Sequence, residues 1–528
     1  MRKRWGVVVI TLILLMALMG CNRGSGVPPD WSTPVNGVIR ADILVIGAGP
    51  AGLAAGNTLV REGKRVLIIE KNGIERVGGA TLGSGGVFMA GGGSKLQASF
   101  GGAALGDTPQ RLFEDLLATG LDNYPRLATL FANNNAPTAD WLLDTLNLPF
   151  APQGVGFIEH RHIRAVSLIG GPAKIGTSML AAYENAGGRI RFNHKAEKLI
   201  VEDGAVVGAL VLSREYGGMA IYADSVILVT GGFGNNKDIL REYAPQLVNV
   251  LYYGPLDACH GDGLLMALAP DIRAHIHYMD RGKIVPHGIQ TAPDFVVSSS
   301  LPSMFVTQNS GAIYVNSSGR RVINENTFLV ELSFATMEND MLFILMDAAT
   351  FEIWRDRLDT WMPKATIDAY IEATVGRPFT GFPIFARHDT IEGVAAIAGV
   401  PPANLRTTVN AFNAGVARGV DAFGRTRPNP LVPIGAGPYY LIEQKPRFAT
   451  TLGGLHINNY MQVLRKTDGK LVPIPGLYAA GEIIGGVHGR DSLPSAGIAW
   501  ALTSGRLAGL STAGRRDQIV ITPDFAVK

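Results

Sequence analysis

Residues 42–71 constrain the fold most strongly, because they combine a strand, a glycine turn, a helix and a second strand in one order. The apolar, β-branched residues 43–46 are typical of a buried parallel strand. Gly47, Gly49 and Gly52 then follow with G-x-G-x-x-G spacing. Such glycines permit a tight turn, close approach of a pyrophosphate, and close packing of helix on strand. The segment therefore predicts a βαβ unit that binds a dinucleotide at its helix N-terminus, beside Ala51.

The second strand of this unit, residues 65–69, ends at an acidic residue, Glu70, which Lys71 follows. A carboxylate at this position can accept hydrogen bonds from an adenosine ribose, but it repels a 2′-phosphate. The pattern therefore favours FAD or NAD over NADP, and it places Glu70 and Lys71 in the same site.

Further glycine-rich segments fit this ligand. Residues 78–93 are rich in glycine, and the lack of side chains lets a ligand approach the backbone closely. A flexible surface loop is the alternative interpretation. Residues 226–234 and 476–482 are each an apolar strand that runs into glycine. Ligands bind at such strand ends in open parallel sheets. Between them, from about residue 282 to 440, strand and helix patterns change character and indicate an inserted domain.

The N-terminus has the pattern of a bacterial export signal. A basic start precedes residues 7–18, a continuous apolar run that is short for a membrane span of about 20 residues. Residues 18–21 resemble a lipoprotein box that ends at Cys21, the expected site of lipidation. Met19 is unusual there, so an uncleaved anchor is the alternative. We expect a signal peptide over 1–21, a flexible tether over 22–38, and a lipoprotein anchored at the periplasmic or extracellular face.

Composition excludes other classes of protein. A net charge of +3 gives no steering toward nucleic acid, and two cysteines in unrelated contexts make a disulfide framework improbable. The cysteines also form no haem-attachment or iron–sulfur motif, and no ligand set has metal spacing. Electrons must therefore pass to or from a separate partner, for which a quinone or a cytochrome is expected.

Several separated motifs together carry a resemblance to a known family. They include residues 42–56, 228–236, 261–269, 319–326, 451–458 and 473–489. The chain resembles the flavoprotein subunits of fumarate reductases and succinate dehydrogenases, and it is also similar to ketosteroid dehydrogenases. The resemblance implies an α/β fold: a discontinuous Rossmann-like FAD-binding domain, residues 39–281 and 441–512, with an inserted α+β capping domain, residues 282–440. Residues 513–528 form a C-terminal tail.

The same resemblance implies FAD as the cofactor, with Glu482 bonded to the ribityl hydroxyls. Because residues 76–93 contain no histidine for covalent attachment, we expect non-covalent FAD. Beyond the first βαβ unit, the expected FAD contacts are Gly78, Gly79, Gly85, Gly86, Ala196, Thr230, Gly231, Gly232, Asp262, Gly481, Glu482 and Gly497.

The catalytic residues that the resemblance implies are missing. The proton-donating arginine of fumarate reductases falls on Leu329, a carboxylate-binding arginine falls on Ser492, and residues 448–451 lack the carboxylate-binding histidine. The tyrosines of the ketosteroid enzymes fall on Phe328 and Leu493. These replacements predict a more apolar pocket and argue against fumarate or succinate as substrate.

Three residues are the remaining catalytic candidates: Arg490, His287 and Ser492. Arg490 can bind a carboxylate or polarise a carbonyl, or it can pair with Asp491 in a surface loop. His287 lies near a family substrate histidine, although a solvated loop histidine is the simpler interpretation.

We therefore expect an FAD-dependent oxidoreductase that acts on a CH–CH or C=C bond next to a carbonyl or carboxylate of a small molecule. Two alternatives remain from the sequence. One is a flavoprotein oxidase or dehydrogenase of other chemistry, and the other is a non-catalytic FAD electron-relay protein.

Overall fold

The strand predicted at residues 43–46 is the end of β1 (Val38–Ile46), which lies in the middle of the larger sheet. Its neighbours β2 (Val66–Ile69) and β9 (Gly217–Leu228) run parallel to it, as buried apolar strands of a doubly wound sheet do. The strand order is β19-β20-β9-β1-β2-β6, and β8 pairs with β9 and β7. The other strands of this sheet are β6 (Arg189–Arg191), β7 (His194–Glu202), β8 (Ala205–Ser213), β19 (Gln462–Thr467) and β20 (Lys470–Ala479).

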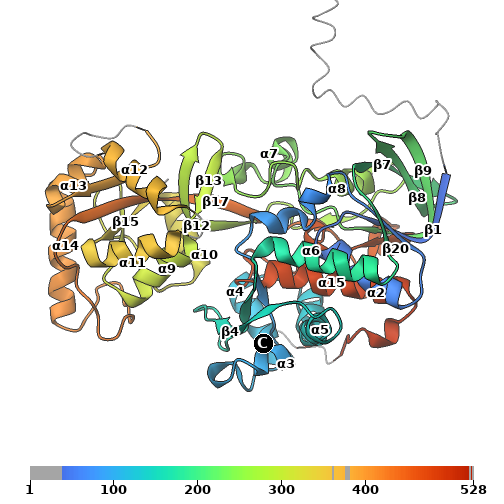
Figure 1. The fold of residues 1–528 in the computed structure, drawn as a ribbon, viewed down its shortest axis with the longest axis horizontal. Helices are drawn as coiled ribbons and strands as arrows, with labels where there is room; N and C mark the ends of the chain where they lie inside the picture. Colours follow the sequence, from blue (N-terminus) through green and yellow to red (C-terminus); the bar gives the residue numbers. More distant parts are fainter. Residues whose placement is uncertain (1–37, 340, 360–361, 375–380, 523–524, 526–528) are drawn as a thin grey trace, which may run out of the picture.

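Three helices pack beside this sheet and form the Rossmann lobe with it (Figure 1). The helix α2 (Pro50–Arg61) begins with proline at a position where the missing N–H costs no hydrogen bond. It packs between α6 (Pro172–Asn185) and α15 (Ala496–Thr512), which comes from the far end of the chain. The remaining elements of this lobe are β3 (Val87–Met89), α3 (Lys95–Ala98), α4 (Pro109–Gly120), α5 (Pro125–Asp144), β4 (Phe150–Val155), β5 (Ala165–Leu168), α7 (Lys237–Tyr243), α8 (Asp262–Leu268), β11 (Ile276–His277) and β18 (Gly454–Leu455).

A second sheet forms the cap, which lies at the left of Figure 1. Its order is β13-β12-β17-β15-β14, with β10 and β16 also paired to β17. The strands are β10 (Leu251–Tyr252), β12 (Gly282–Ala292), β13 (Phe295–Ser298), β14 (Ile313–Asn316), β15 (Leu342–Met346), β16 (Phe385–His388) and β17 (Tyr439–Thr451). Its helices are α9 (Ser300–Asn309), α10 (Leu329–Glu338), α11 (Ala348–Leu358), α12 (Lys364–Thr374), α13 (Ile391–Ile397) and α14 (Pro402–Ala417).

The buried apolar residues follow this division into two lobes. One cluster joins residues before 280 to residues after 447, and two others lie between residues 289 and 442. The expected cap, residues 282–440, begins with the first residue of β12. Its expected end falls inside β17, which continues from the cap to the Rossmann lobe.

The structure, a computed structural model, describes residues 38–339, 341–359, 362–374, 381–522 and 525. Cys21, the expected signal peptide and residues 22–37 of the expected tether lie outside this range. Within it, every helix is too short or too polar to cross a membrane.

Candidate active site

A cavity of about 730 Å³ extends from the strand ends of the Rossmann lobe to the underside of the cap. Gly49, Glu70 and Glu482 line its Rossmann side, and Lys283, Val296 and Leu329 line its cap side. The ends of parallel strands and the capping sheet thus face one common space, which is where a doubly wound fold binds its ligands.

The glycines after β1 give the cavity the shape that a pyrophosphate requires. Gly47 has a φ of +118°, and a Cβ there would lie 2.6 Å from the carbonyl oxygen of Val229. A Cβ on Gly52 would lie 2.1 Å from the Gly47 carbonyl oxygen. Gly49, by contrast, has no protein atom within 4 Å of its Cβ position. The open space at Gly49 therefore leads to the first N–H groups of α2, which suit an anionic phosphate.

Two carboxylates are held at the ends of this cradle. Glu70 accepts hydrogen bonds from the backbone N–H groups of Ala48, at 2.8 Å, and Asn72, at 3.0 Å. Glu482 accepts from the backbone N–H and the hydroxyl of Thr451, at 3.0 and 3.1 Å. Both side chains line the cavity and are held by these hydrogen bonds, so the residues present fit an adenosine ribose at one end and a ribityl chain at the other.

Most residues expected to contact FAD do line the cavity. These are Gly47, Gly49, Ala51, Glu70, Lys71, Gly79, Gly85, Ala196, Thr230, Gly231, Asp262, Gly481, Glu482 and Gly497. Four expected glycines lie behind the lining instead. Gly52 packs on Gly47, Gly78 donates its N–H to the Ala48 carbonyl, Gly86 packs on Pro172, and Gly232 packs on Thr451. They shape the wall, because a side chain there would displace backbone or a neighbouring residue.

The three catalytic candidates are not brought together. Ser492 lines the cavity, but His287 and Arg490 do not. Arg490 is mostly exposed and its Nε lies 3.2 Å from a carboxylate oxygen of Asp122. His287 is fully buried, with Nε2 2.7 Å from the Tyr314 hydroxyl, and burial lowers its pKa to about 3. Neither residue reaches the cavity in this arrangement.

Two cations on paired strands of the cap sheet, which no sequence motif marks, also line the cavity. The Lys283 ammonium on β12 donates to Asp491 Oδ1, at 2.7 Å, and to the Ser492 carbonyl, at 2.5 Å. Arg447 lies on β17, which pairs with β12. No local sequence motif marks either cation, and only the pairing of β12 with β17 places both charges in the cavity.

The positions where the family residues are missing also border this region. Leu329, Thr450 and Ser492 line the cavity, and Lys283 pairs in register with Thr450. The Ser333 hydroxyl bonds the carbonyls of both Ile284 and Leu329, at 2.7 Å each, so the start of α10 is fixed beside β12.

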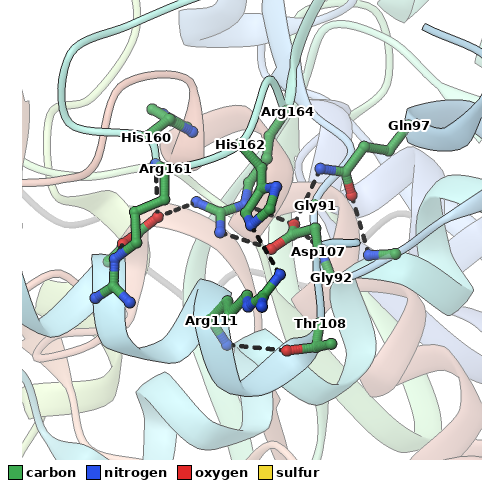
Figure 2. A network of polar contacts seen from close by, with 12 residues as sticks. Gly91, Gly92, Gln97, Asp107, Thr108, Arg111, His160, Arg161, His162 and Arg164 are labelled. Atoms are coloured by element: carbon green, nitrogen blue, oxygen red, sulfur yellow. Dashed lines mark hydrogen bonds and ion pairs between the residues drawn. The ribbon is translucent and has the colours of Figure 1, made fainter. Parts of the chain in front are cut away.

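Figure 2 shows a buried charge network around Arg164, on a segment that also reaches the cavity. Arg164 is fully buried and donates to both carboxylate oxygens of Asp107, at 2.7 Å each, and to Asp115. On the same segment, His160 Nε2 lies 3.0 Å from the Pro494 carbonyl. Pro494 and Phe157 line the cavity, so the network fixes a loop that shapes it.

In the part of the chain that the structure describes, no group of three or more histidine, cysteine, aspartate or glutamate side chains could hold a metal ion.

Comparison with known proteins gives consistent matches over this whole region. A family model described as an FAD binding domain matches residues 42–498. A probable fumarate reductase of Shewanella frigidimarina is 32% identical over 476 residues, which cover 88% of this chain and 74% of that protein. A urocanate reductase of Eggerthella lenta is 29% identical and covers 96% of this chain and 82% of its own length.

Among solved structures, the open conformation of a flavocytochrome c3 fumarate reductase superposes with a TM-score of 0.69 and 29% identity. The match covers 90% of this chain and 78% of that one. The overall fold is thus shared with a flavoprotein of known structure.

Proposed function

Because the chain belongs to the FAD-binding flavoprotein family of the fumarate reductases and succinate dehydrogenases, we propose that it acts on a CH–CH or C=C bond next to a carbonyl or carboxylate, in a substrate other than fumarate or succinate. The fold, the FAD cofactor and the class of an FAD-dependent oxidoreductase, all predicted from sequence motifs, are confirmed by this membership. The substrate and the roles of the residues are our proposal.

One observation carries the proposal: a single cavity joins the FAD cradle at Gly49 and Glu482 to Lys283 and Ser492 under the cap. Bound FAD supplies two-electron redox chemistry. We infer that Gly49 and the start of α2 bind its pyrophosphate, that Glu70 binds the ribose, and that Glu482 binds the ribityl chain without a covalent link.

We propose Lys283 as the proton donor. Leu329 occupies the position of the family's proton-donating arginine, and its side chain has no proton to donate. An ammonium has three N–H donors, and Asp491 and the Ser492 carbonyl occupy two of them. The third is free to donate to a group in the cavity. A donor held in one orientation transfers a proton efficiently to a carbon beside a polarised carbonyl. Ser492 can bind that carbonyl.

The side chains that line the cavity also argue against fumarate as the substrate. Leu329 and Thr450 provide neither of the cations that the resemblance implies at their positions, and Val296, Val297 and Leu301 add apolar surface from the cap. A four-carbon dicarboxylate would leave part of its charge unpaired in such a space, which costs several kcal/mol or more per buried charge.

Anaerobic mixing tests the proposal. The dithionite-reduced holoprotein is mixed with fumarate and with series of enoates and enones, and the flavin absorbance is followed. We expect an enoate or enone to reoxidise the flavin while fumarate does not. Lys283→Gln should slow that step by about 10²- to 10⁴-fold, the usual contribution of a general acid.

Lys198→Gln, a change of an exposed lysine on β7, is the control and should leave the rate unchanged. If no enoate or enone reacts, the proposal is wrong. Fast peroxide release on exposure to oxygen then favours an oxidase, and reaction with a cytochrome alone favours an electron relay.

We also propose that the protein is exported and held at a membrane by lipid on Cys21, and that a quinone or a cytochrome exchanges its electrons. The basic residues at the start of the chain, the short apolar run and the residues around Cys21 support this proposal. Cys21→Ala should move the protein from the membrane fraction to the soluble fraction and abolish labelling by radioactive palmitate. An unchanged membrane fraction would favour the uncleaved anchor.

A further inference from the structure

Arg447 is a cation at the cap end of the cavity, and it is 3% exposed. Its backbone lies on β17 between β12 and β10, opposite Val285 and Leu251. The side chain is therefore carried by a strand that is paired on both sides, which fixes its position in the lining.

Neutral groups accept hydrogen bonds from some, but not all, of the N–H donors of the Arg447 guanidinium group. Nε donates to the His287 carbonyl at 3.1 Å, and Nη2 donates to the Ser300 hydroxyl at 2.8 Å. The Tyr253 ring lies 4.0 Å from the guanidinium carbon. Nη1 is buried and has no hydrogen-bond partner. A donor with no partner in a buried site costs about 1–3 kcal/mol, and more when it is charged.

Other cations at the cavity have a carboxylate partner. Among the lining lysines and arginines that the structure describes, four form ion pairs: Lys71 with Asp262, Arg76 with Asp257, Lys195 with Glu197, and Lys283 with Asp491. Arg447, the fifth, forms none within 4.0 Å in the described residues. Buried arginines elsewhere follow the paired pattern, as Arg164 does with Asp107 and Asp115. A buried charge with no counter-ion is unfavourable unless a ligand supplies one.

We propose that the Arg447 guanidinium group binds one carboxylate group of the substrate, and that the substrate is an elongated monocarboxylate with an apolar body. The inference deepens the proposed function and rests on it for the reacting end of the molecule. One uncompensated cation matches one anionic group, since Lys283 is already neutralised by Asp491.

The length of the substrate follows from β17. Arg447 lies three residues before Thr450, the register partner of Lys283, and three steps on β17 match two steps on β12 because of a register shift. The backbones of Arg447 and Thr450 are therefore about 7–10 Å apart along the strand. Val296, Leu301 and Leu329 are apolar side chains of the same cavity. The anion at Arg447 and the reacting carbons near Lys283 are therefore separated by an apolar chain or ring, a distance that a four-carbon acid does not span.

The test compares an anion with its neutral isostere on the FAD-loaded protein. Octanoate and octanamide are titrated by calorimetry and by perturbation of the flavin spectrum. The wild type should bind octanoate about 10- to 100-fold more tightly, the effect of one charge-assisted hydrogen-bonded pair. Arg447→Gln should remove this preference, and Arg447→Lys should keep part of it.

Lys445→Gln is the matched control, because Lys445 lies on the same strand, bonds Gln290 and does not line the cavity. It should keep the wild-type preference. FAD content and melting temperature show whether each variant is folded, and Arg447→Lys, which keeps the charge, tests the same position if Arg447→Gln does not fold. Equal binding of octanoate and octanamide by the wild type, binding of neither, or a preference that survives Arg447→Gln overturns the proposal.

This outcome is separable from that of the proposed function. Octanoate selectivity with no turnover of any enoate or enone would retain the anion site and reject the reaction. Turnover of enoates by Arg447→Gln with unchanged KM would retain the reaction and reject the anion site.

Discussion

Replacing Gly52 or Gly49 by alanine separates the two tasks of the glycine-rich turn. The Cβ of Gly52→Ala would lie 2.1 Å from the Gly47 carbonyl oxygen and 3.0 Å from Val229 Cγ2. Real contacts of this kind are rarely below 3.0 Å, so α2 must move by about 1 Å from the turn in a close-packed interior. We expect a loss of about 1–3 kcal/mol in the free energy of unfolding, as for other over-packed sites.

Gly49→Ala is the matched substitution. Gly49 has a φ of −72° and no protein atom within 4 Å of its Cβ position, so alanine is accommodated without strain. The new methyl group points to open space at the cavity, where we place the pyrophosphate. We therefore expect unchanged or slightly higher stability of the FAD-free protein, because alanine restricts the unfolded chain, together with much weaker FAD binding.

Thermal unfolding of the FAD-free proteins and fluorescence titration with FAD measure the two effects. We expect a lower melting temperature for Gly52→Ala alone, and weaker FAD binding for both variants. If Gly49→Ala binds FAD as the wild type does, the pyrophosphate does not lie at Gly49. If Gly52→Ala is as stable as the wild type, the turn does not depend on close packing there.

Further predictions follow from other parts of the molecule. Burial lowers the pKa of His160 to about 3, whereas an unfolded histidine titrates near about 6.5, so the unfolded state binds the extra proton as pH falls. Stability contributed by neutral His160 is therefore complete above about pH 6.5 and falls by up to about 1.4 kcal/mol per pH unit between pH 6.5 and 3. His160→Gln should reduce the dependence of melting temperature on pH, and the rest should persist because burial also lowers the pKa of His277, His287 and His488. Arg164→Met should cost about 3–5 kcal/mol in urea unfolding, because it leaves the buried carboxylate of Asp107 unpaired; a cost below 1 kcal/mol would contradict this. Arg490→Ala should change turnover and melting temperature little, since an exposed pair contributes about 0–1 kcal/mol, and abolished turnover would return Arg490 to the site. Glu482→Gln should weaken FAD binding about 10- to 100-fold, measured by fluorescence of released FAD, and unchanged affinity would exclude a charged hydrogen bond to the cofactor.

The cofactor half of the site was predictable because its signals are local. A strand, its glycine turn and the acid at the end of the next strand lie within residues 42–71, and their spacing alone implies close backbone approach to a phosphate. The structure accordingly places Gly49, Glu70 and Glu482 in one cavity.

The substrate half was not predictable from local pattern. Lys283 and Arg447 line one cavity only because β12 pairs with β17, and nothing within either strand specifies that partner. The pairing also shifts register between Lys283 and Ile284, and again between Val285 and Gly288. A shift of one residue exchanges the faces of a strand, so the alternation that would have assigned His287 to one side is broken. His287 consequently bonds Tyr314 in the core of the cap.

Because β17 runs from one lobe into the other, it limits where the chain can be cut when domains are deleted or exchanged by genetic engineering. A cut between residues 440 and 441 would split a 13-residue strand whose last residue, Thr451, donates to Glu482. Deletion of residues 282–440 would remove β12, β13, β14, β15 and β16 and leave the rest of β17 with a bare, aggregation-prone edge. A chimera that exchanges the cap with a relative should therefore be joined after Thr451, so that the donor chain supplies the whole strand together with its own residue at position 447.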